Sequence, residues 1–157
     1  MARRVTGGRV RRWLRTRGGL GVLLGLDRRD FETLAWHAHR RLTRGENDRA
    51  EALYRAILVL RPDDLDAKLG LGACLQSKGD LVGAEAAYDE VLDGDPTHPH
   101  ALTNRAEVRL LGGRIDAAII DLNAACALPP QLLRRSGLIP RLEALRAIID
   151  DSSRSSG

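Results

Sequence analysis

The chain has 157 residues, of which 43% are hydrophobic but only 3% aromatic, and its formal net charge is +4. This length and apolar share are sufficient for one domain with a core, and they exclude a globally disordered chain. The core must be built from Ala, Leu, Ile and Val. Small apolar residues at this density favour packed helices over a β-sandwich, which is richer in β-branched and aromatic residues.

The positive charge is concentrated at the start of the sequence. The first seventeen residues hold seven of the 25 basic side chains and no acidic one, so the remaining 18 basic residues face 21 acidic ones. A nucleic-acid-binding protein would carry a basic face on its folded body. We therefore interpret residues 1–18 as a basic flexible arm and expect no nucleic-acid partner.

A short N-terminal helical segment is expected at residues 19–30. Its apolar run is too short and too often interrupted by Gly for a signal peptide or a membrane span. We expect no stable membrane insertion and a cytoplasmic location. The apolar side chains of the segment have two possible partners, a second copy in a homodimer or the first repeat of the same chain. The candidates for self-association are Leu20, Val22, Leu23, Leu24 and Leu26.

Identical or similar residues recur every 34 positions, which is the period of tetratricopeptide (TPR) repeats. Glycine favours a positive φ in the turn between two helices, alanine permits a close helix crossing, a large side chain fills the space beside it, and proline follows the second helix. The recurring sets are Gly45, Gly79 and Gly113; Ala50, Ala84 and Ala118; Tyr54, Tyr88 and Leu122; and Pro62, Pro96 and Pro130.

The period predicts an all-α fold of three tandem tetratricopeptide (helix-turn-helix) repeats. We expect them to form a short right-handed solenoid with a C-terminal capping helix, because the last repeat would otherwise expose an apolar face. The TPR domain is expected at 31–150, with repeats at 31–64, 65–98 and 99–132, the capping helix at about 138–150 and a flexible tail at 151–157. The repeat helices are expected at about 30–44, 47–60, 65–77, 81–93, 99–111 and 115–128.

Stacked helix pairs make a concave groove that is lined by the first helix of each repeat, and this groove is the expected binding surface. Its lining mixes small and aliphatic side chains with a few polar ones, which suits an extended apolar peptide better than an acidic tail. The TPR register places these candidate peptide-binding residues in it: Ala35, His39, Leu42, Asp66, Leu69, Ala73, Gln76, His100, Thr103, Glu107 and Leu110.

Residues that suggest other chemistry have simpler interpretations. His37 and His39 are two apart on a helix and point in different directions, so they cannot chelate one metal. Asp63, Asp64 and Asp66 stand at a helix start, where carboxylates cap free N–H groups. No nucleophile, acid and base can be grouped into a catalytic set. We expect no enzyme activity, no metal site and no cofactor.

The stretch Leu69-Gly-Leu-Gly-Ala-Cys-Leu-Gln-Ser-Lys-Gly79 resembles the LGLGAC-x-Q-x-x-G sequence of the class II, TPR-containing translocator chaperones of type III secretion systems. The resemblance implies a cytoplasmic chaperone that binds an extended segment of hydrophobic translocator proteins in its groove and keeps them soluble before export. It also implies self-association through the N-terminal segment. Members of this family usually carry aromatic residues at the places of Ala35, His39 and Leu42, so a generic TPR interaction scaffold is the alternative.

Overall fold

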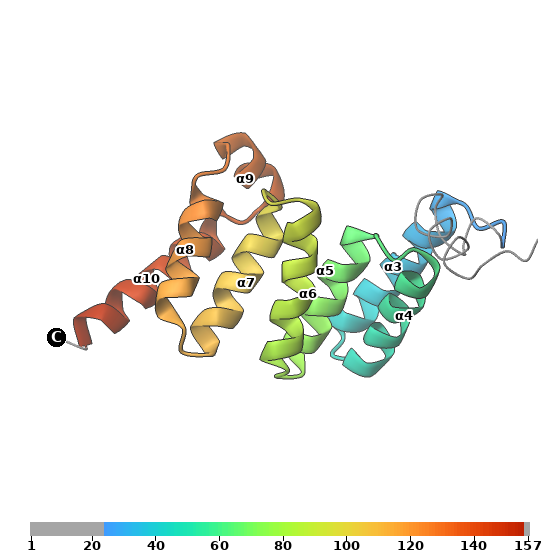
Figure 1. Ribbon diagram of the computed structural model, residues 1–157, viewed down its shortest axis with the longest axis horizontal. Helices are drawn as coiled ribbons and strands as arrows, with labels where there is room; N and C mark the ends of the chain where they lie inside the picture. The colour runs from blue at the N-terminus through green and yellow to red at the C-terminus, as the bar shows by residue number, and fades with distance from the viewer. Residues whose placement is uncertain (1–23, 156–157) are drawn as a thin grey trace, which may run out of the picture. The chain divides into compact units, whose positions relative to one another are not determined.

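The computed structural model describes residues 24–155, and in this part of the chain it has eight α-helices and no strand. Residues 1–23, with the expected arm and with Leu20, Val22 and Leu23, lie outside the described residues. The helices are α3 (Arg28–Thr43), α4 (Asn47–Leu60), α5 (Leu65–Ser77), α6 (Leu81–Gly94), α7 (Pro99–Leu111), α8 (Ile115–Cys126), α9 (Pro130–Ser136) and α10 (Ile139–Ser155), as Figure 1 shows.

The all-helical TPR fold expected from the period is confirmed, and the six helices of the repeats begin and end within two residues of the expected positions. Two differences concern the C-terminal part. A short helix, α9, precedes the final helix, and α10 continues to Ser155, beyond the expected end near residue 150. The chain divides within α5 into two compact units, Met1–Cys74 (unit 1) and Leu75–Gly157 (unit 2), which are described separately.

The glycines of the repeat lie in the turns between paired helices. Gly45, Gly79 and Gly113 have φ angles of +75°, +81° and +72°, which L-residues with a side chain rarely adopt. A Cβ at any of the three would meet nothing within 4 Å. The period therefore fixes glycine at these places because of backbone conformation and not because of lack of space.

Several helices begin at side chains that accept hydrogen bonds from free backbone N–H groups, as caps do. Asp27 and Asp30 form a capping box at the start of α3. Asp64 Oδ1 accepts from the N–H of Ala67, which confirms the capping interpretation of this acidic stretch. At the start of α7, His98 Nδ1 accepts from Ala101 at 3.2 Å.

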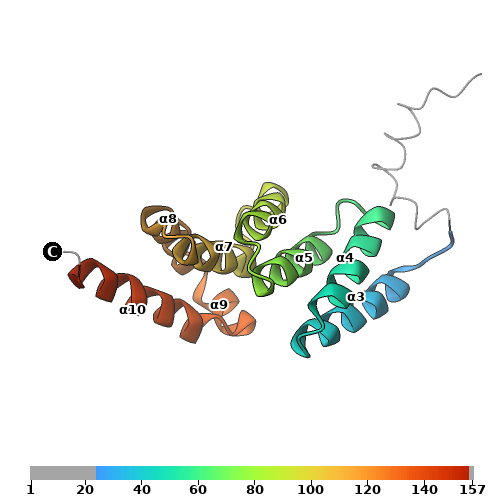
Figure 2. The ribbon, with the colours of Figure 1, turned by 90° about the horizontal axis from the view of Figure 1, so that it is seen from below.

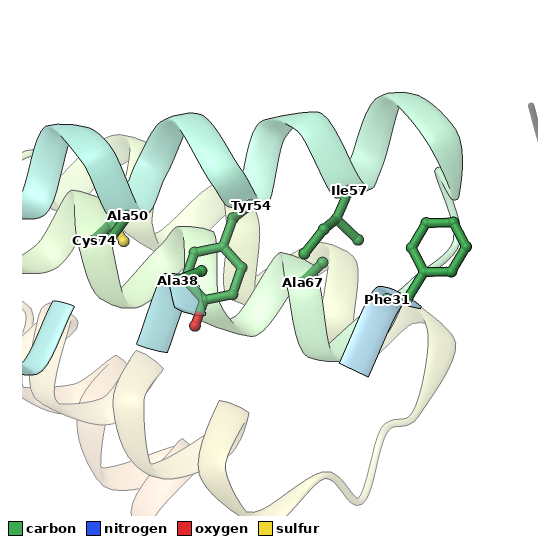
Figure 3. Close-up of a cluster of buried hydrophobic side chains, with 7 residues drawn as sticks. All are labelled: Phe31, Ala38, Ala50, Tyr54, Ile57, Ala67 and Cys74. Atoms are coloured by element: carbon green, nitrogen blue, oxygen red, sulfur yellow. The ribbon is translucent and has the colours of Figure 1, made fainter. Parts of the chain in front are cut away.

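The core of unit 1 lies between α3, α4 and α5 (Figure 3). Its buried members are Phe31 and Ala38 from α3, Ala50, Tyr54 and Ile57 from α4, and Ala67 and Cys74 from α5. The Tyr54 ring packs directly on the backbone of Gly70, where an added Cβ would come within 2.2–2.7 Å of three ring carbons. Burial raises the pKa of Tyr54 to about 12. Gly70 thus permits close helix packing.

Unit 2 places α6, α7 and α8 side by side, and Figure 2 shows α9 and α10 on the same side of the α7–α8 pair. Ala84, Tyr88 and Ala118 expose none of their surface, and Leu122 exposes 2%. The apolar side of α10 is buried as well, through Leu142, Leu145 and Ile149. The final helix therefore covers apolar surface of the last repeat.

Replacing Ala84 by Leu should lower the free energy of unfolding by about 1–3 kcal/mol, because Ala84 has no exposed surface and three extra carbons must displace packed neighbours. The matched control is Ala86→Leu, an exposed position two residues along the same helix, which should change stability little. Urea denaturation followed by circular dichroism measures both. Equal stability of the two variants would contradict the close crossing at Ala84.

Candidate functional site

In unit 1 the expected binding residues divide into exposed and half-buried ones. His39 and Asp66 are exposed, whereas Leu69 and Ala73 are half-buried on α5. Ala35 and Leu42 pack against the core cluster of unit 1 and keep part of their surface accessible. These six side chains form the candidate face of unit 1.

An exposed aromatic residue on α3 was missed by the sequence reasoning. Trp36 keeps 53% of its surface exposed, with the Arg40 guanidinium 4.6 Å from the ring centroid and the His37 ring against its edge. The helical register assigns the face to Ala35, His39 and Leu42 and passes over Trp36. The available signal for this residue was a tryptophan that is not part of the core.

In unit 2 the candidate face comprises Gln76 at the end of α5 and four residues of α7. His100, Glu107, Leu110 and Gln76 are half-buried. Thr103 differs, because it is completely buried and its hydroxyl donates to the Pro99 carbonyl at 2.8 Å. The expectation that Thr103 lines the face is therefore corrected: it is a core residue that offers no surface to a ligand.

The polar side chains of the unit 2 face are joined in one hydrogen-bonded series. The Tyr88 hydroxyl donates to Gln76 Oε1 at 2.8 Å, and Gln76 Nε2 donates to Glu107 Oε2 at 2.7 Å. Arg141 of α10 donates to the same Glu107 oxygen through Nη2 and to Asn104 Oδ1 through Nη1 at 2.8 Å. Sequence reasoning did not find Arg141 or Asn104, which lie 37 residues apart.

His100 lies beside this series. Its burial lowers the pKa of the imidazole, and the nearby His98 and Arg141 act in the same direction. The neutral imidazole is therefore favoured at pH 7. The face then carries one negative charge at Glu107 and one positive charge at Arg141, which are paired with each other.

A second polar cluster connects α6, α7 and α8. Asp121, 1% exposed, accepts a bidentate pair from Arg105 at 2.7 and 2.9 Å and a further bond from Arg109 at 2.8 Å. Arg105 also donates a hydrogen bond to Asp89, and Arg109 donates one to Glu85. A buried charge is tolerated only when it is paired and hydrogen-bonded in this way.

The electrostatics of this cluster follow from its contacts. Hydrogen bonds from Arg114 and Arg109 hold the pKa of Glu85 below its usual range. Burial acts to lower the pKa of Arg105, but its bonds to Asp121 and Asp89 outweigh burial and raise it. Glu85 and Arg105 therefore stay charged at neutral pH, and the cluster holds α6, α7 and α8 together.

Of the five residues expected in self-association, the structure describes two. Leu24 is exposed at 62%, whereas Leu26 is half-buried against the core cluster of unit 1. Leu26 thus folds back onto the first repeat, as one of the two interpretations of this segment expected. Leu20, Val22 and Leu23 lie outside the described residues, so self-association through the segment stays a prediction.

Two general features bear on the kind of site. The part of the chain that the structure describes holds no group of three or more His, Cys, Asp or Glu side chains placed to bind a metal ion. None of the described helices has the length and apolar character needed to cross a membrane.

Comparison with known proteins agrees with this geometry. The family model described as tetratricopeptide repeat matches residues 37–99 and 83–132. Among solved structures, a chain of a type III secretion complex from Aeromonas hydrophila has a TM-score of 0.79 and 23% identity, covering 94% of this chain and 98% of that one. At this identity the likeness shows the fold.

Two further structures contain bound segments. The Yersinia enterocolitica translocator chaperone SycD, in complex with a peptide of the translocator YopD, is 25% identical with a TM-score of 0.69, covering 81% of this chain and 97% of that one. PcrH from Pseudomonas aeruginosa, in complex with the chaperone binding region of PopD, is 30% identical with a TM-score of 0.64, covering 78% and 96%. The chain therefore belongs to the tetratricopeptide repeat family and, within it, to the translocator chaperones of type III secretion.

Replacing Asp121 by Ala should lower the free energy of unfolding by about 3–5 kcal/mol, because Arg105 and Arg109 would lose a shared buried carboxylate. The control is Arg28→Ala, which breaks a pair whose side chains are 87% and 56% exposed and should cost less than about 1 kcal/mol. Chemical denaturation measures both. A loss at Asp121 as small as that at Arg28 would contradict the structural role of the cluster.

Stability should decrease in mild acid partly because of His100. Its folded pKa lies below the unfolded value of 6.5, so below that pH the unfolded chain binds more protons and is favoured. His100→Gln should reduce the loss of unfolding free energy between about pH 7.5 and about pH 5.5, measured by urea denaturation at each pH. An unchanged pH dependence in the variant would contradict the burial of a neutral imidazole.

Proposed function

We propose that the protein is a cytoplasmic chaperone of a type III secretion system, which binds an extended segment of hydrophobic translocator proteins and keeps them soluble before export. The observation that carries this function is the 30% identity to PcrH over 96% of that chain, in a complex that holds the chaperone binding region of PopD. SycD in complex with a YopD peptide supports the same function.

The physical chemistry of such a client explains why it needs a partner. A protein that will insert into a membrane exposes large apolar surfaces, which aggregate in water unless they are covered. A segment held in extended form against helices binds through pockets for its side chains and through hydrogen bonds to helix side chains, because the backbone groups within a helix are already paired. Holding and releasing a segment requires no covalent bond to be made or broken, so the proposed function is binding and not catalysis.

The proposed contact residues are those of the two candidate faces that keep accessible surface. In unit 1 we include the half-buried Leu69 and Ala73, which offer aliphatic contact. In unit 2, the half-buried Leu110 offers apolar contact beside the polar Glu107 and His100. The remaining members are Ala35, His39, Leu42, Asp66 and Gln76. Thr103 is left out because it is buried.

We also propose that the protein forms a homodimer through its N-terminal segment. A crystal structure of SycD, 26% identical to this chain, is described as an alternative dimer. Leu24, exposed at 62% next to the segment outside the described residues, would contribute apolar surface to such a contact. Sedimentation of the full chain and of Leu24→Glu would distinguish a dimer that uses this surface from one that does not.

The function is tested by co-expression with a translocator encoded beside the gene. The translocator expressed alone should be insoluble, and with an affinity-tagged copy of this protein it should become soluble and co-purify with it. The tagged protein co-expressed with an unrelated aggregating protein is the control. A translocator that stays insoluble, or is solubilised no better than the unrelated protein, would contradict the proposed function.

Leu69→Glu should weaken client binding by about tenfold or more, because a carboxylate would replace aliphatic contact on the candidate face of unit 1. The control is Val59→Glu on α4, where the side chain is 68% exposed and outside the candidate face. Pull-down of the co-expressed translocator and circular dichroism measure binding and folding. Equal binding by the two variants would show that Leu69 is not a contact residue. Loss of helicity in Leu69→Glu would show instead that Leu69 belongs to the core.

A further inference from the structure

We propose that Gln76, Glu107 and Arg141 form a polar ladder that binds the main chain of the client segment, and not particular client side chains. The inference rests on the proposed function and deepens it, because it names the chemistry that unit 2 recognises. It also adds to the site a residue of the final helix, Arg141, which the TPR register does not assign to it.

The ladder is built by contacts between three helices. Gln76 of α5 donates to Glu107 of α7, and Arg141 of α10 donates to the same carboxylate and to Asn104. At its inner end the ladder is anchored by the hydroxyl of Tyr88, which has no exposed surface. Its three members are therefore held in position before any client arrives.

Each member keeps unused hydrogen-bonding capacity toward the described residues. Gln76 gives one of its two Nε2 N–H groups to Glu107, and Arg141 uses two of the five N–H groups of a guanidinium. Both bonds to Glu107 end on Oε2, and Oε1 accepts none from the part of the chain described here. Gln76 and Arg141 thus keep N–H donors, and Glu107 keeps an acceptor oxygen, that no described residue uses.

These groups are accessible to a ligand. The side chain of Arg141 is 40% exposed and that of Glu107 is 30% exposed. A segment laid along them could replace water at the free N–H groups and at Oε1. The ladder members stay paired with one another, so binding would not require the Glu107–Arg141 ion pair to break.

Charge favours the main chain as the ligand. The charges of Glu107 and Arg141 cancel, so the ladder offers little net attraction to a charged client side chain. An extended main chain presents both N–H and C=O groups, and leaving one of them unpaired in a contact costs about 1–3 kcal/mol. A surface that offers both N–H donors and an acceptor can pair with both kinds of main-chain group in any client sequence.

One relative has been solved with segments of two different clients. PcrH has been solved with the chaperone binding region of PopD and, at 29% identity to this chain, with that of PopB. A surface that accepts two different segments must recognise something that they share, and every segment shares its main chain. A fixed ladder also reduces the entropy lost on binding, because its side chains are already ordered.

The test uses a synthetic peptide that covers the part of the co-expressed translocator protected from protease in the complex. A series of ester analogues replaces one main-chain N–H at a time and leaves every side chain unchanged. Calorimetry gives the affinity of each peptide for the wild type, Arg141→Met, Gln76→Met and the control Arg114→Met. Arg114 is also a paired arginine, 50% exposed, but it belongs to the cluster around Glu85.

The wild type should lose about tenfold in affinity at one or more ester positions, and this loss should shrink in Arg141→Met and Gln76→Met but not in Arg114→Met. Unchanged ester sensitivity in both ladder variants would overturn the ladder while leaving the proposed function intact. If Arg141→Met does not fold, Gln76→Met alone decides. Failure of the wild type to bind the unmodified peptide would instead overturn the proposed function, and the ladder with it.

Discussion

The close crossing of paired helices is the constraint on which the rest of the structure depends. At Ala50, Ala84 and Ala118 the helices approach so closely that the methyl groups have no exposed surface. In unit 1 the same closeness lets the Tyr54 ring rest on the backbone of Gly70. Because the second helix of a repeat fixes the first one, this packing determines which side chains of the first helix remain accessible to a client.

The elements that follow from local rules could be predicted from the sequence. The 34-residue period predicts glycine with a positive φ in the turns at Gly45, Gly79 and Gly113. The helix ends could also be predicted, because turns and caps depend on residues close to them in the sequence. The helix α9 escaped prediction since seven residues are too few for a periodic pattern. The capping interaction that starts α7 at His98 was not predicted.

The candidate site was predictable only in outline. The helical register predicts which residues share one face of a helix. It does not predict which residues of other segments contact that face. Thr103 is buried and Arg141 reaches Asn104 across 37 residues, and neither fact has a local signal. The same holds for Asp121, whose partners lie on another helix. The unit 2 face therefore carries a connected polar network, where the pattern predicted small and aliphatic side chains with a few separate polar ones.

In the proposed binding mode, the faces formed by the first helices of the repeats hold a segment of a translocator. Hydrogen–deuterium exchange of the protein, alone and in complex with its co-purified translocator, measures this most directly. We expect slower exchange in α3, α5 and α7 on complex formation, with little change in α4 and α6. Protection confined to α4 and α6, or exchange unaltered throughout the described helices, would contradict it.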